Sequence, residues 1–131
     1  AGSGAEVRYN SGEDINAAVQ LAKDSDYAVV FVGASASEGG DRKHLSLDGS
    51  CKTTTLDGKV AKCEGNDEQQ NLLVSEVAKA NKKTIVVASV PGHFLMPWVH
   101  DVSAVLVNFM PGQEAGNAIA DVLFGKVNPS A

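Results

Sequence analysis

The sequence predicts an α/β fold: a three-layer αβα sandwich in which helices cover both faces of a mostly parallel sheet. Three short apolar runs, at residues 27–32, 85–90 and 104–109, are rich in β-branched residues and are followed by a glycine or a Pro-Gly pair. Such runs are typical of strands buried on both faces. Stretches of helical periodicity alternate with them, and this alternation produces parallel sheets with helices on both sides.

The N-terminal part predicts a short strand and then a helix. Residues 6–9 alternate weakly between polar and apolar side chains, which is compatible with a strand. Ser11 to Asp14 has the S-x-x-D pattern of a capping box, so a helix is expected to begin there. One apolar face is formed at helical spacing by Ile15, Ala18, Val19 and Ala22.

Three further helical stretches are expected, at about residues 67–80, 94–99 and 114–124. Trp98 lies in the short middle stretch. It offers a flat surface on which a sugar can stack, but the pattern around it favours burial under the sheet. Gln113 and Glu114 open the last helix, where they suit the helix dipole and are expected to cap exposed amides.

Residues 34–65 break this alternation. They are rich in Gly, Ser, Thr, Lys and Asp, and they follow a predicted central strand at the end where open α/β sheets place ligand sites. Glu38, Asp41 and Arg42 lie close together in this loop. A carboxylic acid on such a loop acts as a general acid where an apolar cleft raises its pKa. An Asp41–Arg42 ion pair would hold the loop, and a solvated surface loop is the alternative interpretation.

Three blocks of sequence carry a resemblance to a known family. They are EGGDR at residues 38–42, followed by leucines 45 and 47; LMPW at 95–98; and PGQEAGNAIADVLFGKVNP at 111–129. In this order they resemble the C-terminal α/β sandwich domain of glycoside hydrolase family 3. The resemblance extends over nearly all of residues 1–131.

The resemblance implies the second domain of a retaining β-glucosidase, which hydrolyses terminal β-linked glucosides or short oligosaccharides without a cofactor or metal. In this family an N-terminal barrel supplies an aspartate nucleophile and the second domain supplies the general acid/base. Glu38 occupies the position that resembles this acid/base. Asp41 and Arg42 resemble a pair that we interpret as a brace of the loop, with contacts to the sugar as the alternative.

The barrel is expected to lie elsewhere in a larger polypeptide. A barrel takes about 250 residues, whereas this chain has 131. A second interpretation is a non-catalytic module, glycan-binding or structural, that keeps the fold without the chemistry.

Cys51 and Cys63 lie in residues 50–65, a stretch that looks inserted relative to the family pattern. Two cysteines do not complete a four-ligand zinc site. A disulfide is therefore favoured, and with it a secreted or otherwise oxidising location.

Composition excludes several other classes of protein. The net charge is −5, with basic residues scattered along the chain, so nucleic acid is not an expected partner. The apolar runs are far shorter than the roughly 20 residues of a membrane span. No glycine-rich phosphate-binding motif follows any predicted strand, which argues against a nucleotide-binding domain.

The disulfide is tested by alkylation without prior reduction, followed by intact-mass measurement. We expect no alkylation of Cys51 or Cys63 until a reductant is added, and two blocked thiols afterwards. A sample that alkylates at both cysteines before reduction contradicts the bridge.

Overall fold

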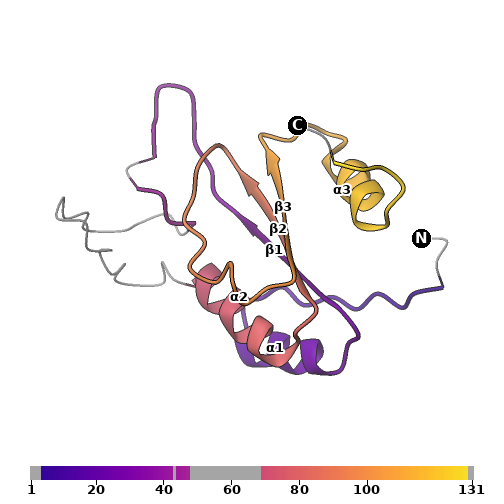
Figure 1. Cartoon of the computed structure of the whole chain (residues 1–131). Helices are drawn as coiled ribbons and strands as arrows, with labels where there is room; N and C mark the ends of the chain where they lie inside the picture. Colours follow the sequence, from indigo (N-terminus) through magenta and orange to yellow (C-terminus); the bar gives the residue numbers. More distant parts are fainter. Residues whose placement is uncertain (1–3, 43, 48–68, 130–131) are drawn as a thin grey trace.

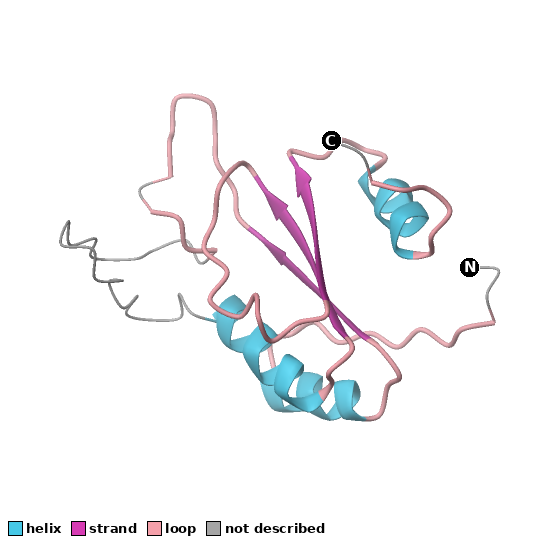
Figure 2. Ribbon diagram, viewed as in Figure 1, coloured by secondary structure: helices cyan, strands magenta, loops and turns pink. Residues whose placement is uncertain are grey.

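The computed structural model of this chain describes residues 4–42, 44–47 and 69–129. These residues form one parallel sheet and three helices (Figure 1, Figure 2). In chain order the elements are α1 (Ile15–Lys23), β1 (Ala28–Gly33), α2 (Gln69–Ala80), β2 (Thr84–Val90), β3 (Ala104–Phe109) and α3 (Ala115–Leu123). The predicted α/β sandwich with a parallel sheet is confirmed.

The sheet has the strand order β1-β2-β3, with β2 in the centre. All three predicted strands are confirmed to within one residue at each end. Their arrowheads point the same way in Figure 1, so their carboxyl ends share one edge of the sheet. The loop that contains Glu38 leaves from this edge.

The hydrophobic core lies between the sheet and helices α1 and α2. Helix α2 packs on β1 and β2, and α1 packs on α2. Because side chains alternate along a strand, residues paired across the sheet share a face, and the core face carries Val30, Val86 and Val105, followed by Val32, Ala88 and Val107. Trp98 joins this core at 1% exposure, and its Nε1 donates to Asn71 Oδ1 at 2.8 Å. Burial of Trp98, the favoured interpretation, is confirmed.

Asn81 joins the amino-terminal edge of the sheet to both core helices. Its buried Nδ2 donates to the carbonyls of Ala22 and Ser25, each at 2.9 Å, at the end of α1. Its Oδ1 accepts from the Lys83 N–H at 2.8 Å, and its carbonyl accepts from Thr84 Oγ1 at 2.6 Å. The side chain is therefore fully paired, as a buried amide requires.

The face of the sheet opposite α1 and α2 is only partly covered by the described residues. On β1, Val29 is 42% and Phe31 62% exposed, whereas Val87 on β2 is fully buried. Helix α3 lies beyond β3, away from α1 and α2, and none of its residues is buried (Figure 1). The expectation that each strand is buried on both faces is therefore met by β2 but not by β1.

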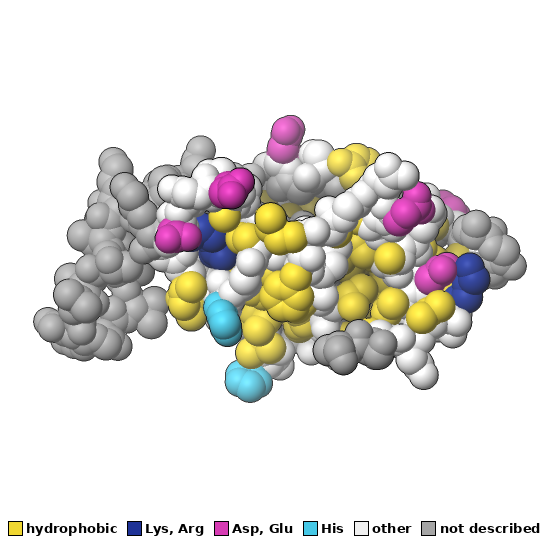
Figure 3. All heavy atoms as spheres, turned by 90° about the horizontal axis from the view of Figure 1, so that it is seen from above, with side chains coloured by type: hydrophobic (Ala, Val, Ile, Leu, Met, Phe, Trp, Pro, Cys, Tyr) yellow, Lys and Arg dark blue, Asp and Glu magenta, His cyan; other side chains and the backbone are white. Residues whose placement is uncertain are grey.

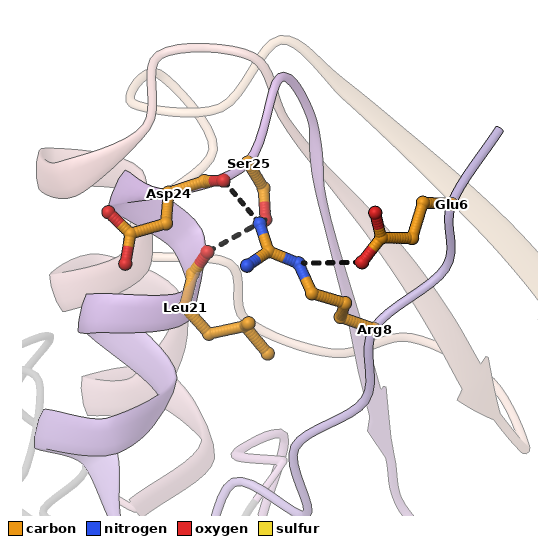
Figure 4. Close-up of polar contacts among 5 residues, drawn as sticks. All are labelled: Glu6, Arg8, Leu21, Asp24 and Ser25. Carbon is orange, nitrogen blue, oxygen red and sulfur yellow. Dashed lines mark hydrogen bonds and ion pairs between the residues drawn. The ribbon is translucent and has the colours of Figure 1, made fainter.

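The predicted strand at residues 6–9 is absent from the structure, where this segment has no regular secondary structure. Arg8 instead ties the segment to the end of α1 (Figure 4). Its guanidinium donates to the Asp24 carbonyl and to Ser25 Oγ and lies 4.0 Å from a carboxylate oxygen of Glu6. A cation suits the carboxyl end of a helix, so the segment packs on α1 rather than on the sheet.

Helix α1 begins later than its capping pattern predicts. Its N-cap is Asp14, whose Oδ1 accepts from the Ala17 N–H at 3.1 Å. Ser11 Oγ accepts from the Glu13 N–H, at 3.4 Å, in the turn before the helix. Ser11 and Asp14 are both residue types that favour the N-cap position. Asp14, which directly precedes the apolar face, begins the helix.

The prediction of a short helix at residues 94–99 is also wrong. Residues 97–101 form turns, with the Val99 N–H donating to the Met96 carbonyl at 3.1 Å and the Asp101 N–H to the Trp98 carbonyl at 2.9 Å. Pro97 has no N–H to donate to a preceding turn, which opposes a continuous helix through this segment.

At α3 the expected amide capping fails as well. Glu114 is the N-cap, but its Oε2 accepts from the Asn117 side chain at 2.7 Å and from no backbone N–H of the helix.

Asp14→Ala is expected to lower the free energy of unfolding by about 1 kcal/mol, because it removes the acceptor at the start of α1. Ser11→Ala is the matched control and is expected to change it by less than about 0.5 kcal/mol. Urea denaturation followed by fluorescence of Trp98, the one tryptophan in the sequence, measures both. A larger cost for Ser11→Ala than for Asp14→Ala would assign the cap to Ser11.

Candidate functional site

Glu38 stands at the tip of a tight turn that begins the loop after β1. The Gly40 N–H donates to the Ser37 carbonyl at 3.0 Å, which closes a four-residue turn with Glu38 and Gly39 in its centre. Gly39 has φ 71°, the left-handed conformation that the third position of a type II turn requires and that glycine adopts without strain. The Glu38 side chain at the centre of this turn is exposed.

The two ends of the described loop, at residues 33 and 47, meet at one side chain of α2. The Gly33 N–H donates to Gln70 Oε1 at 2.7 Å, and Gln70 Nε2 donates to the Gly33 carbonyl at 3.0 Å. The same Nε2 lies 3.4 Å from the Leu47 carbonyl, to which it also donates. Leu47 is 3% exposed and belongs to the core, so the returning end of the loop is anchored.

Arg42 holds the middle of the loop against the segment after β2. Its Nη2 donates to the Ser46 carbonyl at 2.7 Å and its Nη1 to the His93 carbonyl at 3.1 Å. Next to it the Leu95 N–H donates to the Leu45 carbonyl at 2.8 Å. Among the described residues Arg42 and Asp41 form no ion pair, so the expected electrostatic brace is replaced by hydrogen bonds to backbone carbonyls.

An open pocket of about 300 Å³ lies at the carboxyl edge of the sheet, at the base of the same loop. Figure 3 looks onto this edge and shows apolar side chains gathered across it, with acidic ones toward its margins. The pocket is lined by Ala34, Ser35, Ala36, Ser89, Val90, Pro91, Met110 and Pro111. It is therefore largely apolar, with two hydroxyl groups.

A polar pair lies beside this pocket, where the carboxyl ends of β2 and β3 meet. Ser89 Oγ donates to Asn108 Oδ1 at 2.8 Å, and the two residues face each other in the register of the sheet. Asn108 Nδ2 is buried and has no hydrogen-bond partner among the described residues. A buried donor without an acceptor costs about 1–3 kcal/mol, so this group is a place for a further polar contact.

The structure places Glu38, Asp41 and Arg42 on one loop, with both carboxylates exposed and Arg42 partly buried. Cys51 and Cys63 lie outside the described residues. Sequence reasoning missed Gln70, Ser89 and Asn108. A signal existed for the last two, since each is a polar residue near the carboxyl end of an apolar strand, whereas nothing in the sequence pairs Gln70 with Gly33.

In the described ranges, 4–42, 44–47 and 69–129, no three His, Cys, Asp or Glu side chains converge on a point that suits a metal ion. None of the helices in these ranges has the length and hydropathy needed to cross a membrane.

The fold and the loop define a class: an α/β sandwich domain with a carboxylate-bearing loop at the carboxyl edge of its parallel sheet. Residues 3–131 match the family described as "Glycosyl hydrolase family 3 C-terminal domain", and the chain belongs to this family. The resemblance inferred from the three sequence blocks is thereby confirmed.

Relatives across fungi and bacteria agree with this assignment. "Probable beta-glucosidase I" of Aspergillus clavatus is 37% identical over 98% of the chain, and "Thermostable beta-glucosidase B" of Acetivibrio thermocellus is 39% identical over 92%. The crystal structure of DesR, a beta-glucosidase from Streptomyces venezuelae in complex with D-glucose, matches 89% of the chain with a TM-score of 0.71 and 38% identity. The chain spans 13% of the length of the Aspergillus protein and of DesR, and 14% of the Acetivibrio protein.

Arg42→Lys is expected to loosen the loop, because a single ammonium group does not span the Ser46 and His93 carbonyls as the guanidinium does. Loss of one hydrogen bond of about 1 kcal/mol predicts roughly fivefold faster exchange of the Leu95 N–H. Hydrogen–deuterium exchange measures this rate.

Arg8→Lys is the matched control for this change. The Arg8 guanidinium also donates to a backbone carbonyl, that of Asp24, but it does so at the carboxyl end of α1 and not in the loop. Unchanged exchange at Leu95 in Arg42→Lys would show that Arg42 does not brace the loop.

Proposed function

We propose that this chain supplies the general acid/base of a retaining β-glucosidase, with Glu38 as the residue that carries it. The single observation that supports the proposal most is the position of Glu38. It stands at the tip of a glycine turn, on a loop anchored at the carboxyl edge of the sheet, in a domain whose relatives are β-glucosidases. Terminal β-linked glucosides are the proposed substrates.

In the first step the protonated Glu38 carboxyl gives its proton to the glycosidic oxygen while a carboxylate nucleophile attacks the anomeric carbon. The bond to the leaving group breaks, and the sugar becomes covalently attached to the nucleophile. In the second step the Glu38 carboxylate takes a proton from water as the water oxygen attacks the same carbon. Glucose leaves and both carboxyl groups return to their starting states.

The nucleophile of this mechanism would come from another part of a longer polypeptide. Retaining chemistry places the two carboxyl groups about 5–5.5 Å apart, and the barrel expected from the resemblance is the proposed source of the second group. A general acid also needs partial shielding from water. Glu38 is exposed in this chain, so the same part of the polypeptide would supply that shielding.

Features on the far side of the sheet support such a covering domain. Phe31 and Val29 are exposed in the sheet, and Asn108 Nδ2 has no acceptor among the described residues. Exposed apolar sheet faces are uncommon in isolated soluble domains and mark interfaces.

The proposed oxidising or secreted location depends on Cys51 and Cys63.

Glu38→Gln in the full-length polypeptide is expected to lower kcat/KM by about 10²–10⁴-fold for alkyl glucosides or cellobiose, whose leaving groups need protonation. Activated aryl glucosides leave without a proton, so their first step should change little. Steady-state kinetics over a series of leaving groups measures this difference.

Glu13→Gln is the matched control, because Glu13 is an exposed glutamate ahead of α1 and far from the loop along the chain. It is expected to leave all rates unchanged. Equal loss on every substrate in Glu38→Gln would remove the acid role, and full activity would favour the non-catalytic glycan-binding or structural module.

A further inference from the structure

We propose that Gln70 is a positioning residue for Glu38: its side-chain amide fixes both ends of the loop that presents this carboxyl group. The inference rests on the proposed acid/base role of Glu38. It adds a residue on α2 that neither the loop sequence nor the resemblance indicates.

The contacts of Gln70 at the start of the loop are made at the free edge of the sheet. Gly33 ends β1, and the next residue, Ala34, donates its N–H to the Ser89 carbonyl of β2 at 3.0 Å. Successive residues of a strand direct their backbone groups to opposite edges. The N–H and the carbonyl of Gly33 therefore both face away from β2, and Gln70 pairs with both.

The end of the described loop reaches the same amide. A primary amide has one carbonyl and two N–H donors. In Gln70 the carbonyl accepts from Gly33, and Nε2 donates to the carbonyls of Gly33 and Leu47. One side chain thus holds two backbone points between which Glu38 lies, and α2 carries that side chain on a helix packed against the sheet.

The loop has a second attachment at Arg42, so Arg42 and Gln70 hold different parts of it. Arg42 fixes the returning half of the loop to Ser46 and His93. The first half, which contains Glu38, has the Ser37–Gly40 turn and then reaches Gly33. Gln70 therefore controls the base from which Glu38 projects, and a shift of that base of about 1 Å is enough to cost on the order of 10²-fold in rate.

Gln70→Glu and Gln70→Ala in the full-length polypeptide test this role. Gln70→Glu keeps the size of the side chain and the acceptor for the Gly33 N–H but, when ionised, has no hydrogen to donate to the two carbonyls. Gln69→Ala is the matched control. Gln69 is the neighbouring glutamine of the same helix turn, and its Nε2 donates at 3.3 Å to the Glu13 carbonyl rather than to the loop.

The readout is the dependence of kcat/KM on the leaving group, measured on the folded fraction of each variant. We expect both Gln70 variants to lose about tenfold on substrates with poor leaving groups and less than about twofold on activated aryl glucosides. Gln69→Ala should match the wild type. In the Glu38→Gln background the Gln70 changes should add no further leaving-group dependence, because the group they position is already gone.

Failure of the inference and failure of the proposed function give different results. If Glu38→Gln shows the leaving-group dependence but the Gln70 variants lose equally on all substrates, or behave as Gln69→Ala does, Gln70 does not position the acid. If neither Gln70 variant folds, Gln70 is a requirement of the fold and the positioning role is overturned. If Glu38→Gln itself shows no such dependence, the acid/base proposal fails first and the positioning role fails with it.

Discussion

The parallel pairing of β1 with β2 decides where the other functional parts of the chain can lie. It aligns Gly33 with Ser89 and brings the ends of both strands to one edge of the sheet. The approach at that point is close, since a Cβ on Gly33 would lie 3.2 Å from the Ser89 carbonyl oxygen. The absence of a side chain therefore lets β1 keep its ladder to its last residue. The register in turn directs the backbone groups of Gly33 to the free edge, where Gln70 pairs with them.

Features that depend on local sequence could be predicted, and features that depend on distant contacts could not. The three strands followed from short apolar runs with clear stops, and the irregular segment that contains Glu38 followed from the break in their alternation with helices. The start of α1 was misplaced because Ser11 and Asp14 are both good N-caps and packing chooses between them. The burial of Trp98 was predicted, but its segment forms turns rather than a helix, because Pro97 has no N–H to donate to a preceding turn. Gln70 lies far along the chain from Gly33, and only the fold joins them.

The two faces of the sheet are buried to different extents, and the longer chains of the family offer a reason for the difference. Helices α1 and α2 cover one face, and β2 is buried on both sides, yet Phe31 and Val29 remain exposed on the other face. This chain spans 13% of the length of the Aspergillus β-glucosidase. A polypeptide of that length contains enough further residues to cover this face. The pocket and Asn108 Nδ2, which has no hydrogen-bond partner among the described residues, lie at the carboxyl edge of the sheet, from which the loop that contains Glu38 also leaves.

The way the loop is held is consistent with acid catalysis as well as with stability. Both attachments use backbone carbonyls and N–H groups, and among the described residues Arg42 forms no ion pair with Glu38 or Asp41. An arginine paired directly with Glu38 would stabilise its ionised form, which opposes the delivery of a proton. Bracing through the backbone fixes the position of the carboxyl group without that electrostatic cost. Among the residues that the structure describes, the loop thereby combines backbone attachments with a Glu38 carboxyl group that forms no ion pair.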